Sequence, residues 1–329
     1  MNYKRRLAKF NKSLKKTKAS VFQVFLIAVA SFLLGFYVQQ LSLIFDFSFF
    51  NFLSSKPLGS NAENNNSKSA SINPDLAKLQ EEVIPGKGYV FKIRWGDLGK
   101  RLIDDGVVDE AKFTKAITGG DTLPDNLKKY MDGSDQKQIE LNQDNAQFWV
   151  DILWGLGLAN KNDILDKGQM IEGGNTGNYA STGGWTIGQK EPMDIYSKSS
   201  YIALSQKQQE IVEEIAKGVY RPCCGNSTAF PDCNHGMAAL GLIELMVSQN
   251  FSKEEIYKTL LAFNAYWFPS TYLDISYYFA QNGKDYKKIP PKEILSNTFS
   301  SASGYRAIKK EVGAVAWPAL QGGGGGCGA

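Results

Sequence analysis

The chain has 329 residues, of which 43% are hydrophobic and 21% charged, with one histidine and four cysteines. This is an ordinary globular composition, and it excludes wholesale disorder, collagen and coiled coil. The formal net charge of +4 comes from residues 1–20, which hold eight basic side chains and no acid; the remainder has 29 basic and 33 acidic residues. A nucleic-acid-binding domain carries its basic patch on the folded part, so we expect no nucleic-acid partner.

An uncharged apolar segment follows the basic residues. Val21–Val38 has one polar interruption, Gln23. At about 1.5 Å per residue this segment spans roughly 27 Å, enough to cross the core of a lipid bilayer. We therefore predict a single-pass membrane protein with a transmembrane helix within residues 21–40. Residues 1–20 form its basic cytoplasmic tail, and the C-terminal part is extracytoplasmic. A cleaved signal peptide is the alternative, but no A-x-A site follows the apolar stretch.

The remaining chain divides by composition. Residues 41–75 begin aromatic and become rich in Asn and Ser, which predicts an interfacial segment followed by a disordered linker. Helical patterns outnumber strand patterns beyond this point. The sequence predicts one external, mainly α domain with minor β over residues 76–318, and a Gly-rich tail with a cysteine over residues 319–329.

Several elements of the domain can be predicted in chain order from caps and apolar runs. They are a strand over Tyr89–Trp95, a helix from the cap Asp109 through Ile117, a core helix over Ala146–Leu158, a helix from the capping box Ser205/Gln208 through Lys217, an apolar helix over Met237–Ser248, and a helix from the capping box Ser252/Glu255 to Trp267. The Gly-rich segment Glu172–Gly188 matches no phosphate-binding spacing and predicts a long surface loop.

The segment Tyr220–Gly236 combines three of the four cysteines with the only histidine. Cys223, Cys224, Cys233 and His235 fall within 13 positions, among turn-forming residues that fold the loop back on itself. The apolar helix follows directly, and Asp232 or Asn234 could cap it. The positive end of that helix stabilises a thiolate and disfavours an imidazolium. A soft metal requires its ligands in these forms, as a thiolate and a neutral imidazole.

Three interpretations of this loop follow. The first is a metal site for zinc or copper, with Cys223, Cys224, Cys233 and His235 as ligands and Cys327 of the tail as a further candidate. The second is a redox site in a membrane-tethered thiol–disulfide oxidoreductase. The third is a disulfide that staples a structural or interaction domain. The clustering favours the first, so we expect a metal-binding protein in metal handling or sensing rather than an enzyme, with no catalytic residue and with a lipid bilayer and a metal ion as partners.

The run RPCCGNSTAFPDCNHGMAALGLIEL, together with the Gly-rich tail, resembles a motif of bacterial membrane-anchored proteins without an assigned activity. It is also distantly similar to small secreted bacterial proteins with a Pro-Cys-Tyr-Cys-Gly-Cys motif, although the cysteines here are vicinal. The resemblance covers about a tenth of the chain. It implies that Cys223, Cys224, Cys233 and His235 act as a unit.

Overall fold

The computed structural model describes residues 74–320, all of which belong to one compact unit. This part of the chain is mainly helical with a little strand, which confirms the mainly α fold class. The basic tail, the transmembrane helix expected within residues 21–40 and the tail cysteine Cys327 lie outside the described residues. Within residues 74–320, no helix combines the length and the apolar character needed to cross a membrane.

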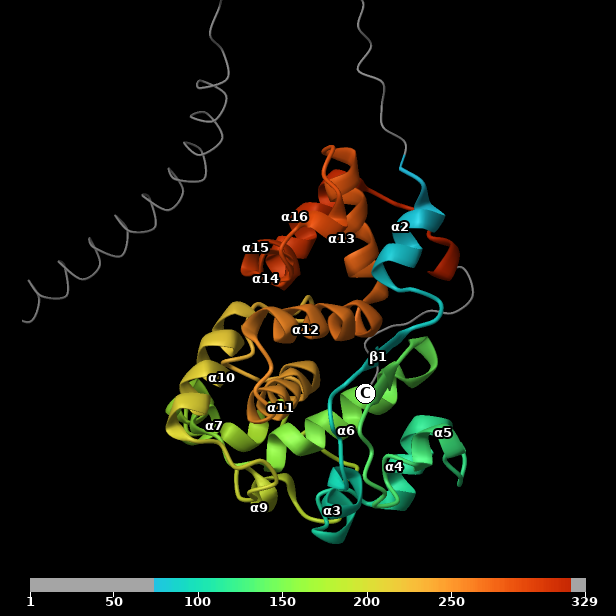
Figure 1. Ribbon diagram of the computed structural model, residues 1–329. Helices are drawn as coiled ribbons and strands as arrows, with labels where there is room; N and C mark the ends of the chain where they lie inside the picture. The colour runs from blue at the N-terminus through green and yellow to red at the C-terminus, as the bar shows by residue number, and fades with distance from the viewer. Residues whose placement is uncertain (1–73, 321–329) are drawn as a thin grey trace, which may run out of the picture. The chain divides into compact units, whose positions relative to one another are not determined.

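Helices of very different length make up the described chain (Figure 1). The longer ones are α2 (Leu76–Val83), α4 (Glu110–Thr118), α6 (Ala146–Ala159), α10 (Gln206–Gly218), α11 (Asn234–Ser248), α12 (Lys253–Trp267), α13 (Pro269–Gln281) and α16 (Ala302–Val312). The shorter ones are α3 (Leu98–Asp104), α5 (Asp125–Lys128), α7 (Asp163–Lys167), α8 (Gln169–Glu172), α9 (Pro192–Ile195), α14 (Pro291–Ile294) and α15 (Asn297–Ser300). Short 3₁₀ turns are η1 (Gln143–Asn145), η2 (Thr176–Asn178), η3 (Tyr286–Lys288) and η4 (Pro318–Leu320).

The two strands, β1 (Tyr89–Phe91) and β2 (Ile139–Leu141), pair antiparallel with Val90 opposite Glu140. The strand expected over Tyr89–Trp95 therefore ends early. Its C-terminal part bonds elsewhere, because Arg94 exchanges both backbone hydrogen bonds with the side-chain amide of Gln249, at 2.9 and 2.7 Å.

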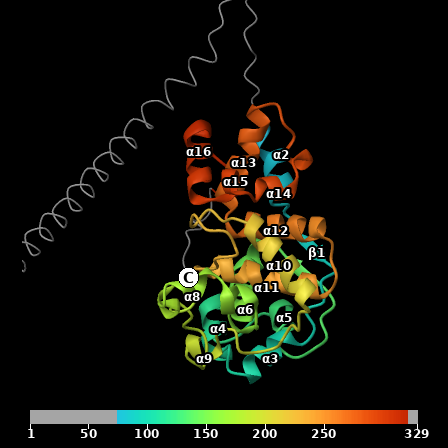
Figure 2. The same ribbon diagram turned by 90° about the vertical axis from the view of Figure 1, so that its left-hand side faces the viewer.

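Helices α6 and α11 form the centre of the domain. Almost every residue of both helices is buried, and the two helices lie side by side (Figures 1 and 2). Helices α10 and α12 pack against α11. Two glycines allow this close contact. A Cβ on Gly157 would lie 2.2 Å from the carbonyl oxygen of Met237, and one on Gly241 would lie 2.6 Å from that of Leu153. The two backbones touch directly, so each position requires glycine.

Three of the sequence-based cap predictions, those for α4, α10 and α12, are confirmed. Asp109 accepts a hydrogen bond from the backbone N–H of Lys112 at the start of α4. Both capping boxes, at Ser205 and at Ser252, form reciprocally at the starts of α10 and α12. The helices expected at these places thus begin where the local hydrogen-bonding pattern requires.

The Gly-rich segment differs from the expected surface loop. Ser181 and Thr182 are fully buried, and Trp185 is 3% exposed. The Trp185 indole donates to the carbonyl of Val107 at 3.0 Å and packs against α6 at Gly155, where an added Cβ would lie 2.9 Å from the ring. An aromatic anchor therefore holds this segment in the core despite its glycines.

The C-terminal helices pack around a buried carboxylate. Helices α13 to α16 and α2 gather at one end of the described unit (Figures 1 and 2). Asp274 of α13 is fully buried and accepts hydrogen bonds from Tyr305, Lys309 and Trp317, at 2.9, 2.8 and 2.9 Å. Each partner donates a hydrogen bond, so the carboxylate is satisfied as an acceptor.

Asp151 of α6 predicts a pH dependence of stability. Burial raises the pKa of Asp151 from 3.8 to about 6, against the hydrogen bond from Gln147, which lowers it. The unfolded carboxyl ionises above about pH 4 but the folded one only above about pH 6, so the free energy of unfolding falls as the pH rises between these values. Asp151→Asn should therefore raise the free energy of unfolding at pH 7 by about 1–3 kcal/mol. Urea denaturation at pH 7 and pH 3 checks this, since the difference should vanish at pH 3.

Candidate functional site

The Cys loop, residues 220–236, connects α10 to α11. At the start of this loop, Tyr220 pairs with Ser227 in an isolated antiparallel β-bridge and donates its backbone N–H to Leu295 O at 2.8 Å. Thr228 returns to α10 by donating to Val219 O at 2.8 Å. A turn closes this loop and carries Cys223 and Cys224 at its tip. The turn-forming residues thus fold the loop back as the sequence predicts.

Three thiols meet above the start of α11. The Sγ atoms of Cys223, Cys224 and Cys233 all lie within 4.8 Å of one another, and those of Cys223 and Cys233 are 3.5 Å apart. All three are free cysteines; Cys223 is exposed and the other two are half-buried. Such a group of sulfur ligands could hold a metal ion and is open to solvent on one side.

A buried arginine binds the thiol cluster from the interior of the domain. Arg221 is 1% exposed, and its Nε donates to Cys233 Sγ at 2.9 Å. Its two Nη atoms donate to Asp232 Oδ1 at 2.6 Å and to the carbonyls of Asn226 and Phe230, each at 3.0 Å. Each of the three guanidinium nitrogens therefore has a partner, and one of these partners is a thiol sulfur.

Gly236 makes room for this guanidinium. A Cβ at Gly236 would lie 2.4 Å from Arg221 Cζ. The glycine in the first turn of α11 is thus a steric requirement of the Arg221–Cys233 contact. Sequence analysis missed Arg221, although the loop contains only two charged residues of opposite sign, Arg221 and Asp232, which is a hint that they pair.

The capping of α11 differs from the expectation. Cys233 occupies the N-cap position and makes no side-chain cap hydrogen bond. The Asp232 carboxylate instead accepts from Arg221 and, at 2.8 Å, from the Asn226 amide. Asn234, the other expected cap, accepts from the N–H of His235 at 2.9 Å. A charged partner outweighs the neutral N–H groups of the helix end as a hydrogen-bond donor for Asp232.

The thiols differ in proton affinity. Hydrogen bonds from Cys223 and Cys224, together with the charge and Nε–H of Arg221, hold the pKa of Cys233 well below its usual value. Hydrogen bonding to Cys224 and Cys233, with burial, raises the pKa of Cys223. For Cys224, the hydrogen bond with Cys223 lowers the pKa. The hydrogen bond with Cys233 and burial outweigh this effect, so the pKa of Cys224 is raised. In the metal-free cluster, Cys233 is therefore the thiol that loses its proton most readily, and the two thiols beside it hold theirs more tightly.

His235 lies beside the cluster but outside it. Its ring centroid is 4.4 Å from that of Phe268 and 5.8 Å from that of Trp267, and the side chain is 8% exposed. Burial lowers the pKa of His235 to about 4, so the ring is neutral, and its buried Nδ1 makes no hydrogen bond. Among the described residues, the three cysteines come together without His235, and the further candidate Cys327 lies outside this part of the chain.

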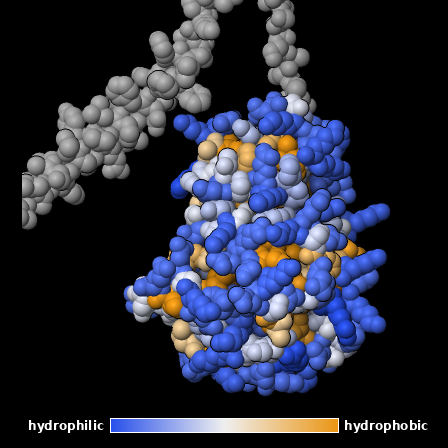
Figure 3. Space-filling view, turned by 60° about the vertical axis from the view of Figure 1, so that its left-hand side comes forward, coloured by the Kyte–Doolittle hydropathy of each residue, from blue (hydrophilic) through white to orange (hydrophobic). Residues whose placement is uncertain are grey.

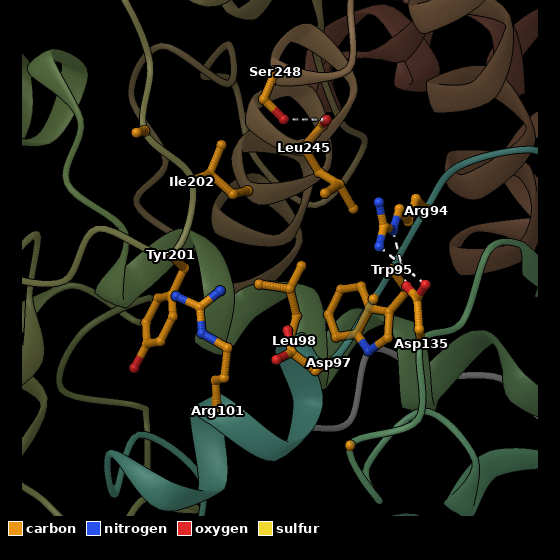
Figure 4. A pocket seen from close by; sticks show the side chains of 13 residues that line it. Arg94, Trp95, Asp97, Leu98, Arg101, Asp135, Tyr201, Ile202, Leu245 and Ser248 are labelled. Carbon is orange, nitrogen blue, oxygen red and sulfur yellow. Dashed lines mark hydrogen bonds and ion pairs between the residues drawn. The ribbon is translucent and has the colours of Figure 1, made fainter.

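A cavity elsewhere in the domain presents fewer free chemical groups than the Cys loop. A pocket of about 520 Å³ is lined by Arg94, Arg101 and Tyr201 among others, and none of the lining residues comes from the Cys loop. Figure 4 shows these side chains around it. Arg94 is engaged by Asp135 at 2.9 Å, and the guanidinium of Arg101 lies 5.2 Å from the centroid of the Tyr201 ring. Its arginines already have partners, so the cavity presents no cluster of free chemical groups comparable with the thiols.

The surface does not point to a docking face either. On the face in Figure 3, hydrophobic residues show in several patches separated by hydrophilic side chains. The most exposed large hydrophobic residues of the described chain, Val90, Ile171 and Met193, lie on three different segments. Isolated apolar residues of this kind are normal on protein surfaces.

The fold and the loop define a helical domain that presents three thiols around a buried arginine. A scan against protein-family models, a search of curated proteins and a search of solved structures find no match to the chain. The function is therefore argued from the site itself.

Cys233 should react at a pH where ordinary thiols do not. In the reduced, metal-free protein, iodoacetamide at pH 6 should modify Cys233 before Cys223 and Cys224, because the thiolate is the reacting form. Gly236→Ala should shift the pH profile of Cys233 upward, since the new Cβ displaces Arg221. Peptide mapping by mass spectrometry measures both profiles. Equal modification of all three cysteines would contradict the assigned thiolate.

Proposed function

We propose that this protein binds one thiophilic metal ion, zinc or copper, through Cys223, Cys224 and Cys233, and that it serves in metal handling or sensing. The observation that carries the proposal is the mutual approach of the three Sγ atoms within 4.8 Å. A metal about 2.3 Å from each sulfur needs sulfurs about 3.8–4.0 Å apart. The 3.5 Å between Cys223 and Cys233 is close to that value, so small side-chain movements would admit an ion.

The exposure of the site supports handling rather than a structural role. Cys223 is exposed and the described residues supply three ligands, whereas four protein ligands close a structural zinc site. The loop is also held without metal: Ala302 donates to Cys224 O at 2.9 Å, and Ser181 donates to Asp232 O at 3.1 Å. An ion could then enter and leave without refolding the domain.

The test is metal stoichiometry in the full-length protein, purified without oxygen. Mass spectrometry should find one equivalent of zinc or copper, with thiols that become free when a chelator removes it. The double variant Cys223→Ser/Cys233→Ser should bind none, while Ser227→Ala, in the same loop but without sulfur, should bind as the native protein does. Undiminished metal in the double variant contradicts the proposal.

Metal removal should leave the fold intact. Because hydrogen bonds fix the Cys loop, the chelated protein should keep its helical circular dichroism and unfold cooperatively, unlike a zinc-dependent domain that loses its structure. Thermal scans of the loaded and chelated protein measure this. Loss of the helical spectrum on chelation would indicate a structural staple instead.

A second candidate function is thiol–disulfide exchange. The 3.5 Å between Cys223 and Cys233 Sγ, with Arg221 against Cys233, favours it specifically. In this arrangement Cys233 is the attacking thiolate and Cys223 the thiol within reach of it. A reduction potential well above about −300 mV would support exchange, and one at or below that value would contradict it.

We also propose that the protein is anchored in a membrane. The basic residues 1–20 followed by the uncharged Val21–Val38 support a membrane anchor with the Cys loop outside the cytoplasm. Alkaline extraction of cell membranes, combined with labelling of Cys223 by a membrane-impermeant maleimide in intact cells, tests both parts. Release into the soluble fraction would contradict the anchor, and protection of Cys223 in intact cells would contradict the external side.

A further inference from the structure

The ligand set around the three thiols is restricted to sulfur. Within residues 74–320, no imidazole or carboxylate joins the group formed by Cys223, Cys224 and Cys233. Two side chains close by could in principle add a fourth ligand: Asp232, which precedes Cys233, and His235, which follows it by two positions. Asp232 Oδ1 accepts a long hydrogen bond from the Cys224 thiol, at 3.8 Å, but the shorter contacts of both side chains are with other groups.

Asp232 is committed to the arginine below the site. Its Oδ1 accepts from Arg221 at 2.6 Å, and its Oδ2 accepts from the Asn226 amide at 2.8 Å. Turning the carboxylate toward a metal would break both bonds and leave the 1% exposed guanidinium of Arg221 without its ion partner. A buried charge that loses its partner is strongly unfavourable, so Asp232 stays with Arg221.

His235 is held by aromatic rings. Its side chain is 8% exposed, with Phe268 at 4.4 Å and Trp267 at 5.8 Å between centroids. Both rings belong to the junction of α12 and α13, which is itself buried in the core. Bringing the imidazole to the sulfurs would remove it from these contacts and leave a gap against a packed interior.

We infer that the site takes Cu(I) as a three-coordinate complex with Cys223, Cys224 and Cys233, without a fourth ligand from residues 74–320. This inference rests on the proposed metal-binding function and specifies its ion. Thiolate sulfur binds both Cu(I) and zinc well, but Cu(I) is complete with three such ligands. Zinc requires four, and the described chain would leave its fourth position to water.

The test is X-ray absorption at the copper edge of the full-length protein, loaded without oxygen with one equivalent of an acetonitrile complex of Cu(I). The expected spectrum has three sulfur neighbours and no nitrogen. A parallel zinc-loaded sample should show three sulfurs and one oxygen. In competition, Cu(I) should displace the zinc completely.

Two variants separate the ligand roles. His235→Gln should leave the copper spectrum unchanged and the affinity within about twofold, whereas Cys224→Ser should weaken Cu(I) by more than the roughly 100-fold that loss of a mere supporting contact can produce. The native spectrum decides the question even where a variant folds poorly.

The outcomes are distinguishable. A fourth nitrogen or a fourth sulfur in the native spectrum, or zinc retained against Cu(I), overturns the three-coordinate copper site and leaves the metal-binding function standing. Failure of both ions to bind the reduced protein overturns the metal-binding function itself.

Discussion

Arg221→Met should lower the free energy of unfolding by about 3–5 kcal/mol, the range expected when one partner of a buried ion pair is removed. Arg221 is 1% exposed and satisfies the Asp232 carboxylate, the Cys233 sulfur and two carbonyl oxygens. Methionine fills similar space but donates no hydrogen bond, so these acceptors would stay buried without partners. Urea denaturation of the reduced, metal-free protein, followed by circular dichroism, measures the loss.

An exposed ion pair provides the matched control. Arg94 pairs with Asp135 through two hydrogen bonds, at 2.9 and 3.0 Å, but the side chains are 66% and 47% exposed. Arg94→Met should therefore cost less than about 1 kcal/mol. If the two variants lost equal stability, burial of Arg221 would not be the cause, and the role given to it here would be wrong.

Gly157→Ala should destabilise the protein by about 3 kcal/mol or more, although alanine favours a helix over glycine by about 1 kcal/mol. The reversal comes from the contact between α6 and α11, where the new Cβ would lie 2.2 Å from the carbonyl oxygen of Met237. The obstacle is backbone on a fully packed helix, which can yield only by separating the two central helices. The same urea denaturation measures this effect.

The control here is a glycine with space around it. A Cβ on Gly120 would meet only the Thr118 hydroxyl, at 3.7 Å, so Gly120→Ala should change the free energy of unfolding by no more than about 0.5 kcal/mol. A neutral or stabilising Gly157→Ala would mean that α6 and α11 are less closely packed than the structure has them.

Local patterns predicted much of the fold. The caps at Asp109, Ser205 and Ser252 depend on residues three positions apart, so the sequence contains the whole interaction. The apolar runs over Ala146–Leu158 and Met237–Ser248 likewise predicted two core helices, which proved to be the central pair.

Buried acids on these helices could not be foreseen in the same way. Glu244 of α11 is fully buried, and burial raises its pKa well above the usual value. Its hydrogen-bond partners are the side-chain amides of Asn160 and Asn162, more than 80 positions away in sequence. No local pattern connects such residues, because helix packing alone brings them together.

The candidate site shows the same division. Turn-forming residues predicted that Cys223, Cys224 and Cys233 would meet, and they do. The direction of the His235 ring depends on Phe268, which is distant in sequence, and its place outside the thiol group was not foreseen. The burial of Arg221 was missed for a related reason: a guanidinium is buried only where several acceptors converge, and that convergence is tertiary.

The hydrogen bonds that anchor the Cys loop have a consequence for the timing of biosynthesis. Tyr220 depends on the carbonyl of Leu295, and the carbonyl of Cys224 depends on the N–H of Ala302. On the ribosome, the cysteines are therefore synthesised well before the segments that arrange them. Until α15 and the start of α16 have emerged, the three thiols are reactive groups on an incompletely anchored loop. The nascent chain would be more open to oxidation at these cysteines than the finished protein, and its maturation would require reducing conditions until the last helices are made.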